Sequence, residues 1–263
     1  MNVEGGGTVV LTGSNTYSGT TTVNSGATLA LSGSGSIAAS SGVVDNGTFD
    51  ISALTSGTSI SSLTGSGSVA LGSRTLTLTD AGGTFSGAVS GSGGLTIAGG
   101  TATLTAANTY TGTTTIDSGA TLALAGAGSV AASHVAIATG AIFDISGATS
   151  GSTVAGLAGA GSVTLGSRTL TLSDAGDSFA GVIAGTGGLI AAGGIETLTG
   201  VNSYTGATSI DAGATLALSG IGSIAASSGV DVATGGTFDI SGTTGGASVT
   251  TLTGSGAVTL GSR

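Results

Sequence analysis

The sequence has no cysteine, no proline, no tryptophan and no lysine, and it has a single histidine. Without cysteine the chain forms no disulfide and offers no thiolate for a metal ion or for nucleophilic attack. Since there is also no second histidine, we exclude a nucleophile–base relay. Aromatic residues make up 3% of the chain and charged residues 6%, which is unlike an ordinary globular protein. We therefore predict no catalytic residues, no metal site and no cofactor, and we do not expect an enzyme.

Positive charge is also scarce. Three arginines stand against twelve acidic residues, for a net charge of −9. Such a chain has no basic patch for a phosphate backbone and no attraction to anionic lipids, so we expect no nucleic-acid partner. No apolar run approaches the roughly 20 residues of a membrane helix, so we expect no membrane insertion by this segment. The start, Met1–Gly5, lacks the pattern of a signal peptide.

Glycine, serine and threonine dominate what is present, and they are arranged in long repeats. The chain has 54 glycines. One stretch occurs three times, at residues 13–37, 106–130 and 200–224. A repeat that keeps its spacing across nearly three copies predicts a repeat architecture. We interpret residues 1–263 as a single array and as an excerpt of a longer chain. Its repeat units, each of about 94 residues, are approximately 13–105, 106–199 and the incomplete 200–263.

Short β-strands are the secondary structure that the pattern predicts. Two apolar residues flank a variable one in eleven tripeptides, such as Leu29-Ala30-Leu31 and Phe49-Asp50-Ile51. This alternation is typical of strands whose outer side chains point inward. The tripeptides follow one another at steps of 20, 20, 26 and 27 residues. We therefore predict an all-β, right-handed parallel β-helix (solenoid) of about eleven coils, its handedness taken from the rule for parallel crossovers.

The tripeptide steps predict a particular stacking. They place four coils in each long repeat, with Leu76 over Ala102 and Leu78 over Leu104. The alternative architecture is an antiparallel β-sandwich or a chain of immunoglobulin-like domains of about 94 residues. The 20-residue steps and the lack of proline favour the β-helix.

Several acidic residues are candidates for catalysis or metal binding. Asp50, Asp144 and Asp239 are each the middle residue of a Phe-Asp-Ile tripeptide. Four coils would separate them by about 19 Å, whereas glycoside hydrolysis needs carboxyls about 5–10 Å apart. We expect solvated, outward aspartates. Asp174 and Asp177 lack the spacing of a calcium loop. Glu196 falls where Ala102 points inward, and we expect a local register shift there rather than a buried site.

The remaining polar candidates are given structural roles. His134 stands where other copies have serine, so we expect it at an exposed turn. The recurring Asn15, Asn108 and Asn202 are interpreted as turn residues, because asparagine tolerates a left-handed backbone and bonds its own backbone. The recurring tyrosines, for which we expect a capping contact on the core rather than a sugar site, are Tyr17, Tyr110 and Tyr204.

The repeated motif resembles that of a known protein family. Leu11-Thr12-Gly13-Ser14-Asn15-Thr16-Tyr17-Ser18-Gly19-Thr20-Thr21-Thr22-Val23, followed by Ser25-Gly26-Ala27-Thr28-Leu29, is similar to the passenger-associated transport repeat of autotransporters. Residues 104–122 and 198–216 match it too, and the three stretches cover less than a third of the chain. The resemblance implies a β-helical stalk that a C-terminal barrel exports through the outer membrane of a Gram-negative bacterium, to the cell surface or beyond. It carries over no catalytic residues.

The resemblance further implies a spacer that aids export and folding and presents an adhesive region. Host or neighbouring cell surfaces would be bound through other parts of the full-length protein, and neighbouring copies could self-associate. The alternative function is an ice- or carbohydrate-binding face, built from outward threonines at 75, 77 and 79 above those at 101, 103 and 105. The coils that start at residues 29 and 49 lack this rank, which favours the spacer.

Overall fold

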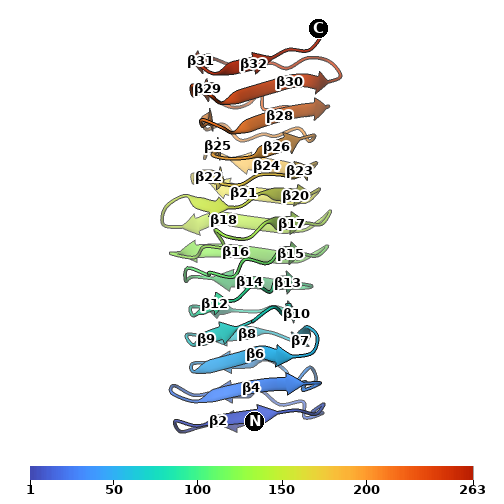
Figure 1. The fold of residues 1–263 in the computed structure, drawn as a ribbon, viewed down its shortest axis with the longest axis vertical. Coiled ribbons are helices and arrows are strands. Elements are labelled where there is room, and N and C mark those ends of the chain that lie inside the picture. Colours follow the sequence, from blue (N-terminus) through green and yellow to red (C-terminus); the bar gives the residue numbers. More distant parts are fainter. Residues whose placement is uncertain (263) are drawn as a thin grey trace. The chain divides into compact units, whose positions relative to one another are not determined.

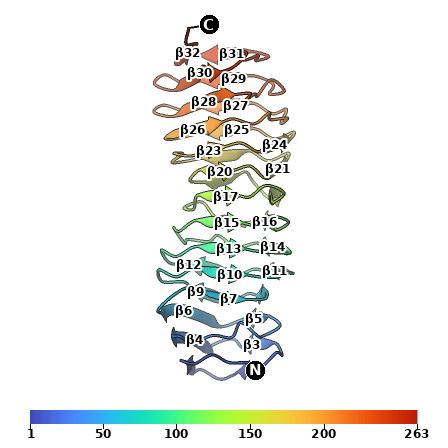
Figure 2. The same ribbon diagram turned by 90° about the vertical axis from the view of Figure 1, so that its right-hand side faces the viewer.

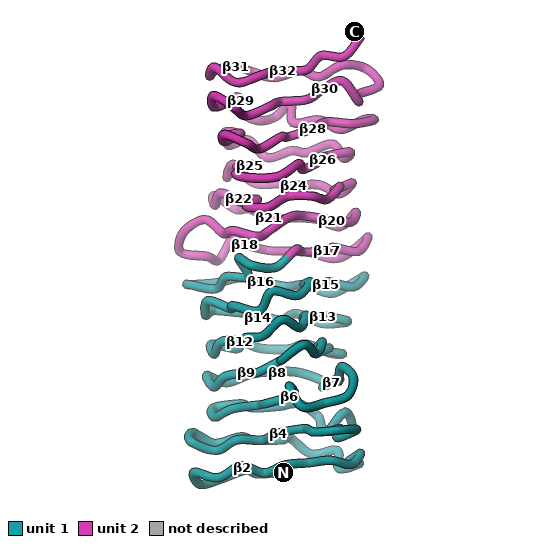
Figure 3. The backbone as a smooth tube through the Cα atoms, in the orientation of Figure 1, with its two compact units in different colours: residues 1–133 teal, residues 134–263 magenta. Residues whose placement is uncertain are grey.

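A computed structural model describes residues 1–262, and these residues form β-strands and turns only (Figure 1). None of the described residues lies in a helix long and apolar enough to cross a membrane. The chain divides into two units, residues 1–133 and 134–263 (Figure 3). The fold is a right-handed parallel β-solenoid, as predicted, but it has about thirteen turns rather than eleven.

The strands of unit 1 belong to three parallel β-sheets, through which the chain passes one after another. Its first sheet consists of β1 (Asn2–Val3), β3 (Thr21–Val23), β5 (Val43–Asp45), β8 (Leu63–Gly65), β11 (Thr84–Phe85), β14 (Thr101–Leu104) and β16 (Thr121–Gly126). Its second sheet consists of β2 (Thr8–Leu11), β4 (Thr28–Gly33), β6 (Thr48–Leu54), β9 (Ser68–Ala70) and β12 (Ala88–Ser90). Its third sheet consists of β7 (Thr58–Ile60), β10 (Leu76–Leu78), β13 (Leu95–Ile97) and β15 (Thr114–Ile116). Figure 2 shows strands of the third sheet above one another.

Unit 2 repeats this winding. Its first sheet consists of β18 (Ile142–Ala148), β21 (Ser162–Gly166) and β24 (Val182–Gly185). Its second sheet consists of β19 (Ser152–Val154), β22 (Leu170–Leu172), β25 (Leu189–Ala191), β27 (Thr208–Ile210), β29 (Val230–Val232) and β31 (Leu252–Gly254). Its third sheet consists of β17 (Val135–Ile137), β20 (Leu157–Gly159), β23 (Ser178–Phe179), β26 (Ile195–Leu198), β28 (Thr215–Gly220), β30 (Thr237–Thr243) and β32 (Ala257–Thr259).

The core of each unit is a column of apolar side chains from successive turns. In unit 1, Leu29 pairs with Phe49, Phe49 with Val69, and Val69 with Val89. All four side chains are fully buried, as the alternating pattern predicts. Each such burial stabilises the fold by roughly 1.5–3 kcal/mol relative to an exposed side chain.

The predicted stacking was right for the 20-residue steps and wrong for the longer ones. Val69 is followed in its column by Val89, and not by Leu95. Leu95 lies beside Leu76 in another sheet, and Ala102 pairs with Leu122. Leu76 therefore does not lie over Ala102, nor Leu78 over Leu104. The reason is that apolar–x–apolar strands of all three sheets look alike in sequence. A step of 26 or 27 residues therefore connects strands of two different sheets rather than neighbours in one column. The turn length stays near 20 residues, which gives the larger number of turns.

The long repeat is not a whole number of turns. In unit 1, β4 lies in the second sheet with β2 and β6, whereas its copy β16 lies in the first sheet with β14. Likewise, β3 lies in the first sheet and its copy β15 in the third. In unit 2, β17 and its copy β29 also lie in different sheets. With turns near 20 residues, a repeat of 93 to 95 residues spans about four and two-thirds turns of three sheets.

Glycine is required where one turn passes close to the next. Gly65 has φ +109°, and a Cβ there would lie 2.1 Å from the Asp45 carbonyl oxygen. A Cβ on Gly93 would lie 1.8 Å from the Arg74 carbonyl oxygen. These corners therefore set how closely successive turns pack.

Candidate functional site

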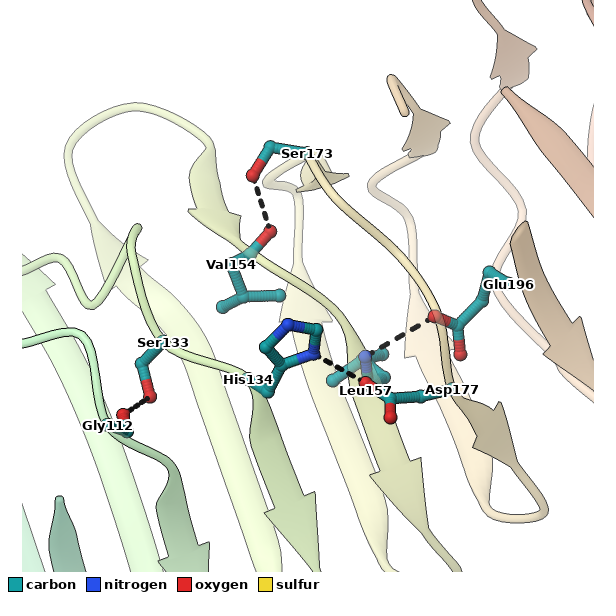
Figure 4. A network of polar contacts seen from close by, with 8 residues as sticks. All are labelled: Gly112, Ser133, His134, Val154, Leu157, Ser173, Asp177 and Glu196. Carbon is teal, nitrogen blue, oxygen red and sulfur yellow. Dashed lines mark hydrogen bonds and ion pairs between the residues drawn. The ribbon is translucent and has the colours of Figure 1, made fainter. Parts of the chain in front are cut away.

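A chain of buried hydroxyl groups is the polar centre of each motif copy. In the second copy, the Tyr110 hydroxyl lies 2.6 Å from Thr114 Oγ1, and that oxygen lies 2.8 Å from Ser133 Oγ. Ser133 Oγ in turn donates to the Gly112 carbonyl oxygen at 2.7 Å (Figure 4). Since a carbonyl oxygen only accepts, the protons run from tyrosine to threonine to serine to the backbone. Every hydroxyl of this chain therefore has an acceptor, which removes the cost of burying it.

The first and third copies build the same chain. The tyrosine–threonine distances are 2.7 Å for Tyr17–Thr21 and 2.7 Å for Tyr204–Thr208. The threonine–serine and serine–carbonyl distances are 2.9 and 2.9 Å in the first copy (Thr21, Ser40, Gly19) and 3.0 and 2.9 Å in the third (Thr208, Ser227, Gly206). Burial raises the pKa of the Tyr110 and Tyr204 phenols well above the ordinary value, so both stay neutral.

The tyrosines therefore lie in the core, as expected from the sequence. Tyr110 and Tyr204 are 0% exposed and offer no ring face to a sugar. Tyr17 is half-buried and keeps the same hydroxyl contact.

The motif asparagines connect successive turns. Asn108 Nδ2 donates to the carbonyl oxygens of Ala106 and Ser129, each at 3.0 Å, while its Oδ1 accepts from the Val89 N–H at 2.9 Å. Asn202 makes the equivalent three bonds. No non-glycine residue among residues 1–262 has a positive φ, so the left-handed backbone expected for these asparagines is wrong. Their side-chain amides bond their own backbone, at the carbonyl oxygen two residues earlier, as expected, and also bond backbone groups of neighbouring turns.

The side chains of the tripeptide aspartates accept hydrogen bonds from the backbone of their own strands. Asp50 Oδ1 accepts from the Ser52 N–H at 2.8 Å, beside a bulge at which the pairing of β4 with β6 shifts. Asp144 and Asp239 make the same contact with the serine two residues on, at 2.8 and 2.9 Å. Each aspartate thus binds a backbone N–H of its own strand, and the half-buried carboxylates do not converge on one another.

His134 follows a turn and is partly exposed, and it also contacts an aspartate, which the sequence did not predict. Its Nδ1 lies 2.6 Å from Asp177 Oδ2, and the two side chains are 41% and 29% exposed (Figure 4). One complete turn of the solenoid lies between the turns that carry these two residues. A Cβ at Gly156, on that turn, would lie 2.7 Å from Asp177 Oδ2 and 3.0 Å from His134 Nδ1. The contact therefore requires glycine, which has no Cβ, at position 156.

Glu196 is buried, and the register shift expected for it does not occur. It pairs with Leu216 as Ala102 pairs with Leu122, so its side chain points into the core and is 0% exposed. Its Oε2 accepts from the Leu157 N–H at 3.3 Å, and its Oε1 has no hydrogen-bond partner. Burial, together with the charge of Asp177, raises the pKa of Glu196 to about 8.

Asp45 is a second inward acid, which the sequence reasoning missed. It is 0% exposed, and its Oδ1 accepts from the Gly47 N–H at 3.1 Å. Burial raises its pKa to about 6. The signal was present, because the corresponding strands of the other copies end in Ile137 and Val232.

The outward threonines form one column rather than the predicted double rank. In unit 1, Ser59, Thr77, Thr96 and Thr115 pair in succession on the third sheet. The predicted rank was wrong, since Thr77 lies in β10 of the third sheet, whereas residues 101–104 form β14 of the first.

These contacts define a class of protein. The described residues contain no group of three His, Cys, Asp or Glu side chains placed to hold a metal ion. The motif's interior polar groups bind the chain's own backbone, so their geometry serves the solenoid itself. The molecule is a parallel β-solenoid repeat protein.

Comparison with known proteins agrees with this class. The family model of the passenger-associated-transport-repeat matches residues 3–31, 99–124 and 193–223. No curated protein and no solved structure matches the chain. The chain thus carries three passenger-associated transport repeats and matches an autotransporter passenger domain with such repeats.

Proposed function

We propose that this chain is a structural stalk of a bacterial surface autotransporter adhesin, which supports export and presents an adhesive region that lies in other parts of the full-length protein. The observation that carries the proposal is the three transport repeats, each built into the solenoid through its buried hydroxyl chain. A stalk needs turns that support one another and no catalytic group. The proposal includes the absence of enzymatic activity and a place outside the outer membrane.

Deletion of one complete long repeat tests the stalk. In a full-length passenger, removing residues 32–124 joins Leu31 of β4 to Ala125 of β16. These two strands are equivalent in the two copies, and Leu31 takes the position of Leu124. Residues 1–31 then stand where 94–124 stood, so each following strand keeps a neighbour of the same kind. Because turns contact only their neighbours, we expect a folded, exported and shorter passenger.

The matched control removes half a turn, residues 32–41. It leaves strands without their neighbours and exposes unpaired edges, so we expect protease sensitivity and loss of surface display. Protease resistance and surface labelling measure both variants. Loss of a specific binding or catalytic activity in the long deletion, with folding and display intact, would contradict a purely structural role.

A second candidate function uses the hydroxyl column of Ser59, Thr77, Thr96 and Thr115, which could face ice or a carbohydrate surface. The flanking positions Gly57 and Gly94 break a parallel second rank. Thermal-hysteresis and polysaccharide pull-down assays test it. Activity that disappears when Thr77 and Thr96 become valine would favour this function over the stalk.

A further inference from the structure

One patch of unit 2 differs chemically from its counterpart in the preceding repeat. The patch has His134, Gly156, Asp177 and Glu196 where that repeat has Ser41, Ser62, Gly83 and Ala102. His134, Gly156 and Asp177 directly precede β17, β20 and β23, and Glu196 lies in β26. These four strands are consecutive neighbours in the third sheet. Four changes that are far apart in sequence thus lie on adjacent turns.

Two of the residues bridge across a turn. His134 and Asp177 meet at 2.6 Å over the turn that carries Gly156. A side chain at Gly156, such as the serine of the preceding repeat, would occupy the space of this contact. The histidine, the aspartate and the glycine therefore form one arrangement (Figure 4).

Glu196 lies on the next turn, beneath the surface. The pairing of Ser178 with Thr197 aligns Asp177 with Glu196. Asp177, and through it His134, are the titratable groups on the turns packed against Glu196. The other neighbouring strands, β20 and β28, contain none, and the nearby Asp174 and Asp211 are exposed.

We propose that these residues form a proton-operated clasp, which holds the turns of residues 156–198 firmly packed while Glu196 is protonated and loosens them when Glu196 loses its proton. A neutral Glu196 fits an interior in which only one of its oxygens has a donor. His134 pairs with Asp177, whose charge faces Glu196. After Glu196 loses its proton, two carboxylates face each other and one of them is buried.

The direction of the pH effect follows from the pKa of Glu196. Burial raises it from 4.5 to about 8. The stabilisation that this group provides is therefore complete below pH 4.5 and is lost as the pH rises through about 8. Deprotonation of Glu196 thus loosens these turns toward alkaline pH.

Hydrogen exchange followed by mass spectrometry on the whole chain between pH 5 and 9, corrected for the intrinsic exchange rate, tests the clasp. We expect peptides that cover β20, β23 and β26 to lose at least tenfold in protection as the pH rises. Glu196→Ala, which restores the residue of the preceding repeat, and Glu196→Gln, which keeps the shape, should both show protection that is independent of pH.

The comparison is made on the same peptides in each variant, so the buried Asp45 of unit 1 does not contribute. A wild-type pH dependence that persists in Glu196→Gln would overturn the proposal. So would constant protection of the wild-type turns across this pH range.

Discussion

At the scale of the residue, the buried hydroxyl chain of the motif is tested by removing its first member. Tyr110→Phe keeps the ring in the core but leaves Thr114 Oγ1 without its donor. We expect a loss of about 1–2 kcal/mol in the free energy of unfolding, measured with urea. Tyr17→Phe is the matched control. Tyr17 is half-buried, so water can replace its hydroxyl and the loss should be smaller. Equal losses would mean that the burial of the chain does not matter.

Asp45 gives a pH-dependent prediction in unit 1. Its pKa is raised from 3.8 to about 6, so the stabilisation is present below pH 3.8 and lost as the pH rises through about 6. Asp45→Val places there the residue of the third repeat, Val232. We expect it to stabilise the protein at pH 7 by roughly 1–3 kcal/mol and to have no effect near pH 3. Thermal melts at both pH values measure this, and a gain at low pH alone would contradict it.

The sequence predicted correctly for some residues, but not for others, whether the side chain points into the core. Phe49, Asp50 and the tyrosines were placed correctly, because alternation decides which side chains point inward. Glu196 was misjudged, since an acid at an inward position was taken as a sign of altered register. A solenoid interior accepts one carboxyl if it stays protonated. The His134–Asp177 contact could not be predicted, because it joins residues 43 positions apart through the missing side chain of Gly156.

At the scale of the element, glycine at the corners allows successive turns to approach as closely as the hydrogen-bonded strands require. Gly93→Ala would place a Cβ 1.8 Å from the Arg74 carbonyl oxygen, so the backbone must move. We expect a loss of at least about 2 kcal/mol in the free energy of unfolding. Gly82→Ala is the control, because a Cβ there meets nothing within 4 Å and the backbone φ is not positive. One variant places a Cβ against a carbonyl oxygen of the neighbouring turn and the other places it in open space, and similar melting temperatures would refute the role of the corner.

Strand positions were predictable, but their assignment to sheets was not. Period-two alternation located most strands, including Leu76–Leu78 and Leu95–Ile97. It carries no label for which of the three sheets a strand joins. Only the uniform turn of about 20 residues decides this, and the recurrence of the motif near 94 residues suggested an even division that does not exist.

At the scale of the whole molecule, the repeats and the parallel solenoid were readable from the sequence, because self-similarity survives any error in the register. The transport repeats explain why the spacing is maintained. Each copy supplies the same asparagine, tyrosine, threonine and serine contacts, which tie a turn to its neighbours.

The fractional number of turns in a long repeat has a consequence for how such a chain presents itself. Because a long repeat ends two-thirds of the way round a turn, the two motif copies of unit 1 lie on different sheets, about a third of a circle apart. Adding or removing one such repeat would therefore change the direction in which the neighbouring strands face as well as the number of turns.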